Sequence, residues 1–447
     1  NMPSSGTIIA QYADAPVGSE IRRLVDDNAD TKYVTYHSSF NITWNGNSSK
    51  AVTAYSLTSA ADTPEMDPKD WTLYGSNDNT TWTELDAQTN QLFAARKEEK
   101  SYEVDNATSY RYYRLSVEAN NGGAATQIAE WKLVAMRSYT ENINDLIASK
   151  GSSTFSAITP MGRQHENDRE ATAADMKWLA DPAEEPEPFG DGGTKMAWNT
   201  FNVVSIYPNG NPVMSDVNQR WVGDCCACAV IASMAYLYPR FVKHIIKDNM
   251  DKTYTVTMYD PKGKQISVGV GGDYFIGNSG DLGALGGRNK EVTWATILEK
   301  AMIKWNQIYQ GSSNVGGIGT EYVSAIFTGD GESVGFGANA LIAEDLQRAV
   351  EVSLKQGRLV IGGFTRSGEQ VDQNWQTTSG HAFTFILPDD NTHLFKMRNP
   401  WGGTTDGVMK VKDDGRIPPM IDLRICAPGA AKNYGVGPDL GGYIPNF

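Results

Sequence analysis

The stretch that decides the fold of this chain reads Gln219-Arg-Trp-Val-Gly-Asp-Cys-Cys-Ala-Cys-Ala-Val-Ile-Ala-Ser-Met-Ala235. It holds three of the four cysteines of the chain, and the run after Asp224 is apolar and free of glycine, which is typical of a buried helix. Gly223 and Asp224 favour a helix start, because aspartate can accept hydrogen bonds from the unpartnered N–H groups of a first turn. Cys225 is therefore expected at a helix N-terminus. There the helix dipole and a nearby cationic histidine can lower a thiol pKa from about 8.5 to roughly 3.5–7.5.

Two distant segments supply partners for this cysteine. His381 leads one face of a predicted strand that continues to Leu387, and a second predicted strand from Leu394 ends at Asn399, directly before Pro400. Cysteine, histidine and asparagine in this chain order are the arrangement of a papain-like thiol hydrolase. Zinc binding by Cys225, Cys226 and Cys228 is disfavoured, since one helix points these side chains around its axis and offers no distant pair of ligands.

Several separate segments resemble the calpain-type cysteine proteases, and together they cover about residues 195 to 425. They are Gln219 with Gly223-Asp224-Cys225, Gly380-His381-Ala382, Arg398-Asn399-Pro400-Trp401-Gly402, the segment Trp294 to Ala301, and the segment Ala325 to Gly329. One position departs from the pattern, because calpains usually carry tryptophan where this chain has Cys226. That departure puts the packing around the nucleophile in doubt and leaves Cys226 as an alternative nucleophile.

The resemblance implies a role for each matched residue. Cys225 would be the nucleophile, His381 the general base and then acid, and Asn399 the residue that orients the imidazole. Gln219 would donate to the oxyanion together with the Cys225 N–H, and Trp401 would shield the bond between His381 and Asn399. Gly380 and Asp224 complete the expected support of the site. No EF-hand loop is present in the sequence.

The composition limits the classes of partner. The net charge of −14 and the absence of a basic cluster argue against nucleic acid binding. The longest apolar run, Ala227 to Tyr238, is shorter than the about 20 residues that a transmembrane helix needs. The first residues carry no signal-peptide pattern, so we expect a leader that was removed or none. A chain of 447 residues is expected to form two or three domains.

The first 136 residues alternate in short strand-like runs separated by turns, which predicts an antiparallel β-sandwich. The segments Val25 to Tyr33, Asp67 to Asp78 and Tyr112-Tyr-Arg-Leu115 on to Glu130 resemble discoidin, or coagulation-factor C-type, modules. These are jelly-roll sandwiches that include family 32 carbohydrate-binding modules. The resemblance implies a structural calcium at Asp26, Asn28, Thr31 and Glu130, for which a solvated acidic turn is the alternative. Glycan-binding candidates, chosen by loop position, are Tyr36, His37, Trp44 and Arg96; a core or edge position for Trp44 is as well supported.

These observations predict three segments: a discoidin-like glycan- or surface-binding sandwich at 1–136, a connector at 137–193, and an α+β, papain-like protease domain at 194–447. The connector wraps the catalytic domain or acts as a propeptide. The protease domain is divided into a helical lobe at about 194–345 and a strand-rich lobe at about 346–447. The predicted function is protein hydrolysis by a cysteine endopeptidase that needs no cofactor for its chemistry. The alternatives are an amide hydrolase or acyl transferase of transglutaminase-like type and an inactive binding protein. The resemblance of the first domain implies an extracytoplasmic location of bacterial type: secreted, periplasmic or at the cell surface.

Overall fold

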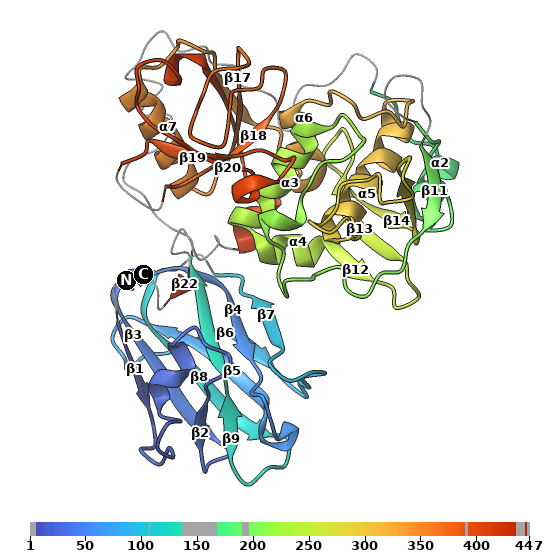
Figure 1. The fold of residues 1–447 in the computed structure, drawn as a ribbon. Helices are drawn as coiled ribbons and strands as arrows, with labels where there is room; N and C mark the ends of the chain where they lie inside the picture. Colours follow the sequence, from blue (N-terminus) through green and yellow to red (C-terminus); the bar gives the residue numbers. More distant parts are fainter. Residues whose placement is uncertain are drawn as a thin grey trace. The chain divides into compact units, whose positions relative to one another are not determined.

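The computed structural model describes residues 6–106, 108–135, 168–189, 196–388, 392–434 and 443–444. The chain forms two compact units, one of Asn1–Ser138 with Lys432–Phe447 and one of Tyr139–Ala431 (Figure 1). This division differs from the predicted one at the C-terminal end. Residues 443–444 form strand β22, which pairs antiparallel with β10 of the first unit, so these two residues belong to the first unit and not to the second. A two-residue strand has no sequence pattern that predicts its partner.

The first unit is built from two antiparallel sheets and a short ribbon. One sheet has the order β1 (Gly6–Ala10), β3 (Phe40–Lys50), β8 (Tyr110–Asn120), β5 (Pro68–Ser76), β6 (Thr83–Gln88). The other has the order β22 (Tyr443–Ile444), β10 (Glu130–Ala135), β4 (Val52–Thr58), β7 (Glu99–Glu103). The ribbon pairs β2 (Tyr33–Thr35) with β9 (Thr126–Ile128), and the 3-10 turns are η1 (Ile21–Val25) and η2 (Pro64–Met66).

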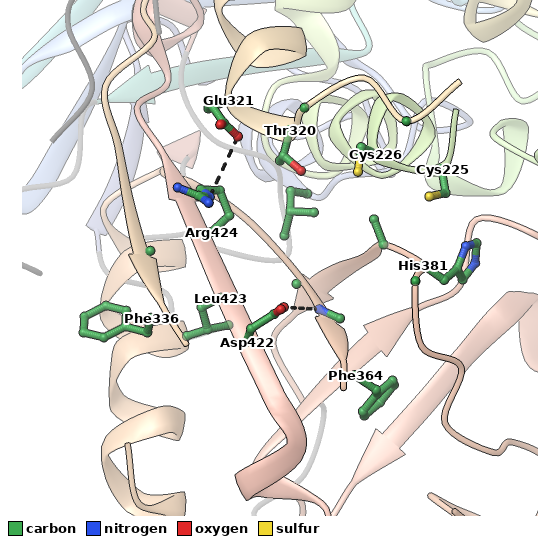
Figure 2. A pocket seen from close by; sticks show the side chains of 18 of the residues that line it. Cys225, Cys226, Thr320, Glu321, Phe336, Phe364, His381, Asp422, Leu423 and Arg424 are labelled. Carbon is green, nitrogen blue, oxygen red and sulfur yellow. Dashed lines mark hydrogen bonds and ion pairs between the residues drawn. The ribbon is translucent and has the colours of Figure 1, made fainter. Parts of the chain in front are cut away.

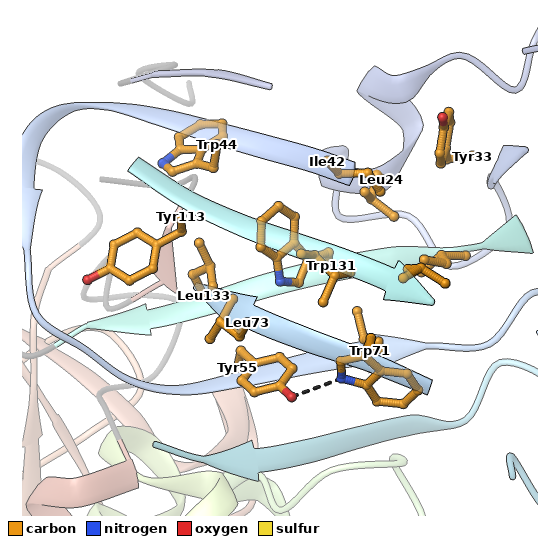
Figure 3. Packing of buried hydrophobic residues seen from close by; sticks show 14 of the residues in the cluster. Leu24, Tyr33, Ile42, Trp44, Tyr55, Trp71, Leu73, Tyr113, Trp131 and Leu133 are labelled. Atoms are coloured by element: carbon orange, nitrogen blue, oxygen red, sulfur yellow. Dashed lines mark hydrogen bonds between the residues drawn. The ribbon is translucent and has the colours of Figure 1, made fainter. Parts of the chain in front are cut away.

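One apolar core joins the two sheets, which confirms the predicted β-sandwich (Figure 3). Alternate residues of β8, such as Leu115, and of β3 are buried against Trp131 and Leu133 of β10. Trp71 is buried with its indole N–H donating to the Tyr55 hydroxyl at 2.9 Å, so its polar atom has a partner in the core.

The second unit begins with a helical half. Its helices are α2 (Ala173–Ala180), α3 (Cys225–Leu237), α4 (Pro239–Ile245), α5 (Trp294–Tyr309) and α6 (Thr320–Thr328). Small sheets accompany them: β11 (Ala197–Thr200) with β15 (Asp273–Ile276), and β12 (Ile246–Asp248), β13 (Tyr254–Tyr259) and β14 (Gln265–Val270). A 3-10 turn, η4 (Met214–Asp216), precedes α3.

A six-stranded antiparallel sheet completes this unit. Its order is β16 (Ser333–Phe336), β21 (Ile421–Cys426), β17 (Leu359–Phe364), β18 (Phe383–Ile386), β19 (Phe395–Arg398), β20 (Val408–Val411). The part of the chain that forms this sheet also contains helix α7 (Ala343–Lys355) and the 3-10 turns η5 (Thr404–Gly407), η6 (Pro418–Met420) and η7 (Gly429–Tyr434). Helices α5 and α7 and strand β17 each follow an apolar pattern of the sequence. The strand predicted from His381 begins two residues later, at Phe383.

Part of the predicted connector packs on α5. Lys300 forms an ion pair with Glu185 at 2.6 Å, and the Lys304 ammonium donates to the Asp181 carbonyl at 2.9 Å. Both lysines are buried, because residues 168–189 cover the face of α5 that the sequence pattern leaves polar. The described part of the connector thus packs on the second unit. Residues 136–167 and 190–195 lie outside the described residues, and both alternatives for the connector, a wrapping segment and a propeptide, stay predictions.

Candidate active site

Cys225 is the first residue of α3, as the sequence predicts. The helix is buried from Ala227 to Leu237 and contacts both the helical half and strands β17 and β18 of the sheet. Thr384 of β18 donates from its hydroxyl to the Ala229 carbonyl at 2.7 Å, which fixes α3 against the sheet. The start of the helix, and with it Cys225, therefore lies where the two halves of the unit meet.

Asp224 precedes Cys225 but does not cap the helix with its side chain, which corrects the sequence-based expectation. Its carboxyl is fully buried beside Glu299 of α5, and Cys228 donates from its thiol to Asp224 Oδ1 at 3.3 Å. Burial raises the pKa of Asp224 to about 6 and the pKa of Glu299 well above its ordinary value. We read the two acids as a pair that shares a proton, since two adjacent carboxylates in a dry interior cannot both ionise.

Glu299 is a residue that the sequence analysis missed, although a carboxylate within an otherwise buried helix was a signal. Ligand atoms of Asp224, Cys228 and Glu299 lie within 4.8 Å of one another, which is close enough for a metal ion. The Leu285 N–H donates to Glu299 Oε1 at 2.9 Å. Each acid therefore accepts a hydrogen bond from the protein itself, Asp224 from the Cys228 thiol and Glu299 from the Leu285 N–H, with no metal ion involved.

The Cys225 thiol has a pKa lowered to about 4. The neighbouring Cys226 thiol lowers it most, His381 and the Ala382 backbone N–H also lower it, and burial opposes them. The same contact raises the pKa of Cys226, so the proton stays on Cys226 and the negative charge on Cys225. The electrostatics therefore favour the thiolate form at Cys225 over that at Cys226.

His381 is held by two contacts, one at its Nε2 and one on the face of its ring. Its Nε2 lies 2.8 Å from Asn399 Oδ1, and the indole of Trp401 stacks on the imidazole with 4.3 Å between ring centroids. The Trp401 backbone N–H donates to the same Asn399 oxygen at 3.0 Å, so this atom accepts and His381 Nε2 must donate. Nδ1 is then the ring nitrogen left to exchange a proton with Cys225, which His381 contacts.

Asn399 is itself buried at the end of β19, and Arg398 beside it is buried as well. The Arg398 guanidinium donates to the Val217 carbonyl at 2.8 Å and lies 3.6 Å from Asp406. Arg398 thus ties the strand that carries Asn399 to the segment that leads into α3. Sequence reasoning gave Arg398 no role, although a charge at the end of an apolar strand was a usable signal.

Cys225 and His381 line the same cavity of about 590 Å³, called the cleft below (Figure 2). The other lining residues are Cys226, Gly317 to Glu321, Gly335 to Gly337, Ile361 to Phe364, Gly380, Ala382 and Asp422 to Arg424. Gly380 has a φ of 63°, a conformation that glycine adopts without strain. The cleft therefore offers room for a polymer chain beside the thiolate.

Gln219 lies near this site without lining the cleft. Its side-chain Nε2 donates to the Val222 carbonyl at 2.9 Å, and its backbone N–H donates to the Pro400 carbonyl at 2.7 Å. An amide nitrogen has two hydrogens, so one N–H remains for another acceptor. The oxyanion role of Gln219 stays a prediction.

In the first unit, the four predicted calcium ligands converge. Thr31 donates from its hydroxyl to Asp26 Oδ2 at 2.8 Å, and the Asn28 backbone N–H donates to Glu130 Oε1 at 3.0 Å. Burial, and then the Asp26 side chain, raises the pKa of Glu130 to about 8. This cluster of oxygen donors, with two acids that oppose each other's ionisation, fits a hard cation such as Ca²⁺.

The glycan-binding candidates do not form one group. Trp44 is only 4% exposed and belongs to the sandwich core, so its predicted glycan contact is wrong; Phe40, Ile42 and Trp44 alternate inward along β3, a period-two pattern visible in the sequence. Arg96 donates with both guanidinium arms to Asp67, which gives it a structural task. Tyr36 is 61% exposed, and His37 stacks on Tyr12 at 3.6 Å, so these two remain candidates.

Comparison with known families decides the identity of the second unit. Residues 198–407 match the family described as calpain family cysteine protease. The segment is a calpain-family domain. The match includes Cys225, His381 and Asn399, and it ends within the turn η5 that follows Trp401.

Other relatives match smaller parts of the chain. A peptide-N(4)-(N-acetyl-beta-glucosaminyl)asparagine amidase of Arabidopsis thaliana is 46% identical over 80 residues, which are 17% of this chain and 11% of that protein. This chain thus spans about a ninth of that relative. Solved structures similar to the N-terminal region include the family 32 carbohydrate-binding module of Streptococcus pneumoniae EndoD, with 17% identity, 29% of this chain and 95% of that chain covered, and a TM-score of 0.26. A Clostridium perfringens module in complex with GalNAc-beta-1,3-galactose has 14% identity, covers 29% and 94%, and has a TM-score of 0.26.

No single helix in the described ranges is long and apolar enough to span a membrane. A joined pair, α3 and α4, is apolar and long enough only when its two helices are counted together, and they are bent by 113°. Helix α3 is buried from Ala227 to Leu237, and α4 buries Phe241, Val242 and Ile245.

Proposed function

We propose that the calpain-family domain is a cysteine endopeptidase in which Cys225 is the nucleophile, His381 the general base and Asn399 the residue that orients it. The observation that supports this most is the convergence of Cys225 and His381 on one cleft, with His381 Nε2 bound to Asn399 at 2.8 Å. Cys225 and His381 are distant in sequence yet share this cleft, and the bond to Asn399 leaves His381 Nδ1 to exchange the proton.

In this proposal, the Cys225 thiolate attacks the carbonyl carbon of a peptide bond in the cleft. His381, protonated in the resting ion pair, gives its proton to the leaving amine, and water then hydrolyses the thioester with His381 as base. The second N–H of Gln219 and the backbone N–H of Cys225 would stabilise the oxyanion, and one such donor contributes about 10²- to 10³-fold in rate. Trp401 limits water access to the bond between His381 and Asn399, since it stacks on the imidazole.

A thiol-specific inhibitor tests the assignment. One equivalent of iodoacetamide is expected to label the protein at Cys225 and to abolish peptide cleavage. Cys225→Ala is expected to lose the fast labelling, whereas Cys226→Ala keeps it. Fast labelling that persists in Cys225→Ala, or that moves to Cys226, would contradict the proposal.

A second candidate is hydrolysis of a side-chain amide or acyl transfer of transglutaminase-like type. The 80-residue match to an asparagine amidase favours considering it. The same thiolate and base would serve this chemistry, so the substrate decides. Ammonia or glycan release from an intact protein substrate would favour the amidase, and new N-termini would favour the peptidase. An inactive binding protein, the third alternative, predicts neither product.

The same proposal gives the N-terminal sandwich the task of holding the enzyme on a glycan or cell surface outside the cytoplasm. The exposed Tyr36 and the stacked His37 supply an aromatic surface of the kind on which sugar rings pack. A calcium ion held by Asp26, Asn28, Thr31 and Glu130 would neutralise the opposed acids and fix the loop. Retention on immobilised glycans tests the glycan-binding role, and fractionation of the native cells tests the location outside the cytoplasm.

A further inference from the structure

Three charged side chains line the cleft besides Cys225 and His381: Glu321, Asp422 and Arg424. Arg424 Nε lies 3.8 Å from Glu321 Oε2, so these two charges largely cancel (Figure 2). In the proposed resting ion pair, the charges of Cys225 and His381 cancel in the same way. Among the described residues that line the cleft, the carboxyl groups of Glu321 and Asp422 outnumber the Arg424 guanidinium by one negative charge. Burial raises the pKa of Asp422, while the Gly363 N–H and the charge of Arg424 lower it.

The carboxylate of Asp422 is held in a fixed place. Asp422 lies on β21 between the buried residues Ile421 and Leu423, and its own side chain is exposed. Its Oδ1 accepts the Gly363 N–H at 2.9 Å. An ionised carboxylate can accept about four hydrogen bonds, so capacity for a ligand remains.

This place is close to the reacting groups. A Cβ atom at Gly363 would lie 2.7 Å from the His381 carbonyl oxygen and 3.6 Å from Asp422 Oδ1. The backbone of Gly363 thus links the carboxylate to the backbone of the base. A substrate side chain that reaches Asp422 belongs to a residue near the scissile bond.

The walls around Asp422 are apolar. Phe336, Phe364 and Leu423 line the cleft on either side of it, as Figure 2 shows. The neighbouring wall positions 335, 337, 362 and 363 are glycines, which keep space open for a long side chain. An aliphatic stem with a cationic end matches this surface, whereas an acidic side chain would meet a like charge.

From this geometry we propose that Asp422 is a specificity-determining residue, which makes the cleft prefer a substrate with lysine or arginine near the cleaved bond. The inference rests on the proposed peptidase function and names a substrate class for the same site.

Matched peptides test the inference. In a positional scan, lysine or norleucine is placed at each of the four residues on either side of the cleaved bond; norleucine has the lysine stem without the ammonium. At one position, kcat/KM is expected to favour lysine by about tenfold, a typical effect of about 1.4 kcal/mol for a hydrogen bond between charged groups. In Asp422→Asn, which keeps an oxygen for the Gly363 N–H, the ratio is expected to approach one.

Asp413→Asn is the matched control, because it removes the same charge from an exposed residue outside the cleft lining, and it is expected to leave the ratio unchanged. A wild-type ratio near one at every position would overturn the inference and leave the peptidase function intact. A ratio that survives in Asp422→Asn would also overturn it.

An alkylation experiment separates the inference from the proposed function. Tripeptidyl chloromethyl ketones with lysine or norleucine at one of their three positions react with Cys225 without turnover of a peptide. A rate of alkylation about tenfold higher with lysine, dependent on Asp422, supports the inference even if no peptide is cleaved. Equal rates at all three positions contradict a preference on the side of the cleaved bond that these probes occupy, whether or not the protein is a peptidase.

Discussion

The imidazole of His381 and the amide of Asn399 are joined through Nε2 and Oδ1 at 2.8 Å, and the Trp401 N–H binds the same oxygen at 3.0 Å. The amide is therefore fixed from two sides, and the imidazole takes its orientation from a buried residue. This relationship makes Nδ1 the ring nitrogen that serves Cys225, and it leads to a first prediction.

Replacing Asn399 by alanine is expected to lower kcat by about 10²-fold, because His381 loses the partner that sets its tautomer and orientation. KM should change little, since Asn399 does not line the cleft. Steady-state kinetics on a fluorogenic peptide measure both. A change confined to KM would show that Asn399 acts on substrate binding instead.

The acid limb of Cys225 reactivity is expected near pH 4, where the thiolate is lost as pH falls through its lowered pKa of about 4. Cys226→Ala removes the largest cause of that lowering and should move the limb to higher pH, whereas Cys226→Ser keeps a donor and should move it less. The rate of iodoacetamide labelling as a function of pH measures the shift. Identical profiles in all three proteins would contradict the assigned role of Cys226.

The pair formed by Asp224 and Glu299 is expected to make the protein less stable as pH rises. Folding raises both pKa values, so the folded chain binds more protons than the unfolded chain and its stability falls as pH rises above about 4. The contribution of Asp224 is lost by about pH 6, and the loss from Glu299 extends to higher pH. Glu299→Gln keeps a donor to Asp224 and should flatten the dependence, while Glu299→Ala costs about 1–3 kcal/mol at any pH. Urea unfolding at pH 5 and pH 8 measures this. Equal pH dependence in wild type and Glu299→Gln would exclude the shared proton.

Calcium is expected to raise the melting temperature of the N-terminal sandwich, and EGTA to reverse the effect. At 100 times its Kd, a ligand that binds only the folded state adds about 2.7 kcal/mol. Because the pKa of Glu130 is about 8, protons compete with the cation, and the shift should be larger at pH 8.5 than at pH 6. Glu130→Gln should abolish the shift. A melting temperature that ignores calcium in the wild type would exclude the site.

Trp44 and Tyr36 should behave in opposite ways. Trp44→Ala empties part of the sandwich core and is expected to cost about 3–5 kcal/mol. Tyr36→Ala is expected to change stability by less than about 0.5 kcal/mol, because its side chain is exposed, yet to weaken retention on immobilised glycan. Unfolding curves and glycan-column retention of both variants distinguish the two roles. Unchanged retention in Tyr36→Ala would remove it from the candidates.

The elements that the sequence predicts best are those with a local apolar pattern. Helix α5 was predictable because its apolar residues recur at helical spacing, and β17 because it is an uninterrupted apolar run. The alternation along β3 also indicates that Trp44 is buried, which its choice as a glycan-binding candidate by loop position did not take into account. The burial of Lys300 was not predictable, since the segment that covers it lies more than a hundred residues earlier.

The sequence by itself determined that Cys225 begins a helix and that a sandwich precedes a calpain-family domain, because helix starts, periodicity and motif order are properties of neighbouring residues. Only the tertiary structure decided that Asp224 turns to Glu299 rather than to its own helix, that Cys226 and His381 share in setting the Cys225 charge, and that Asp422 faces the cleft. Burial and the approach of distant charges fix these features, and neither is written in the order of neighbouring residues.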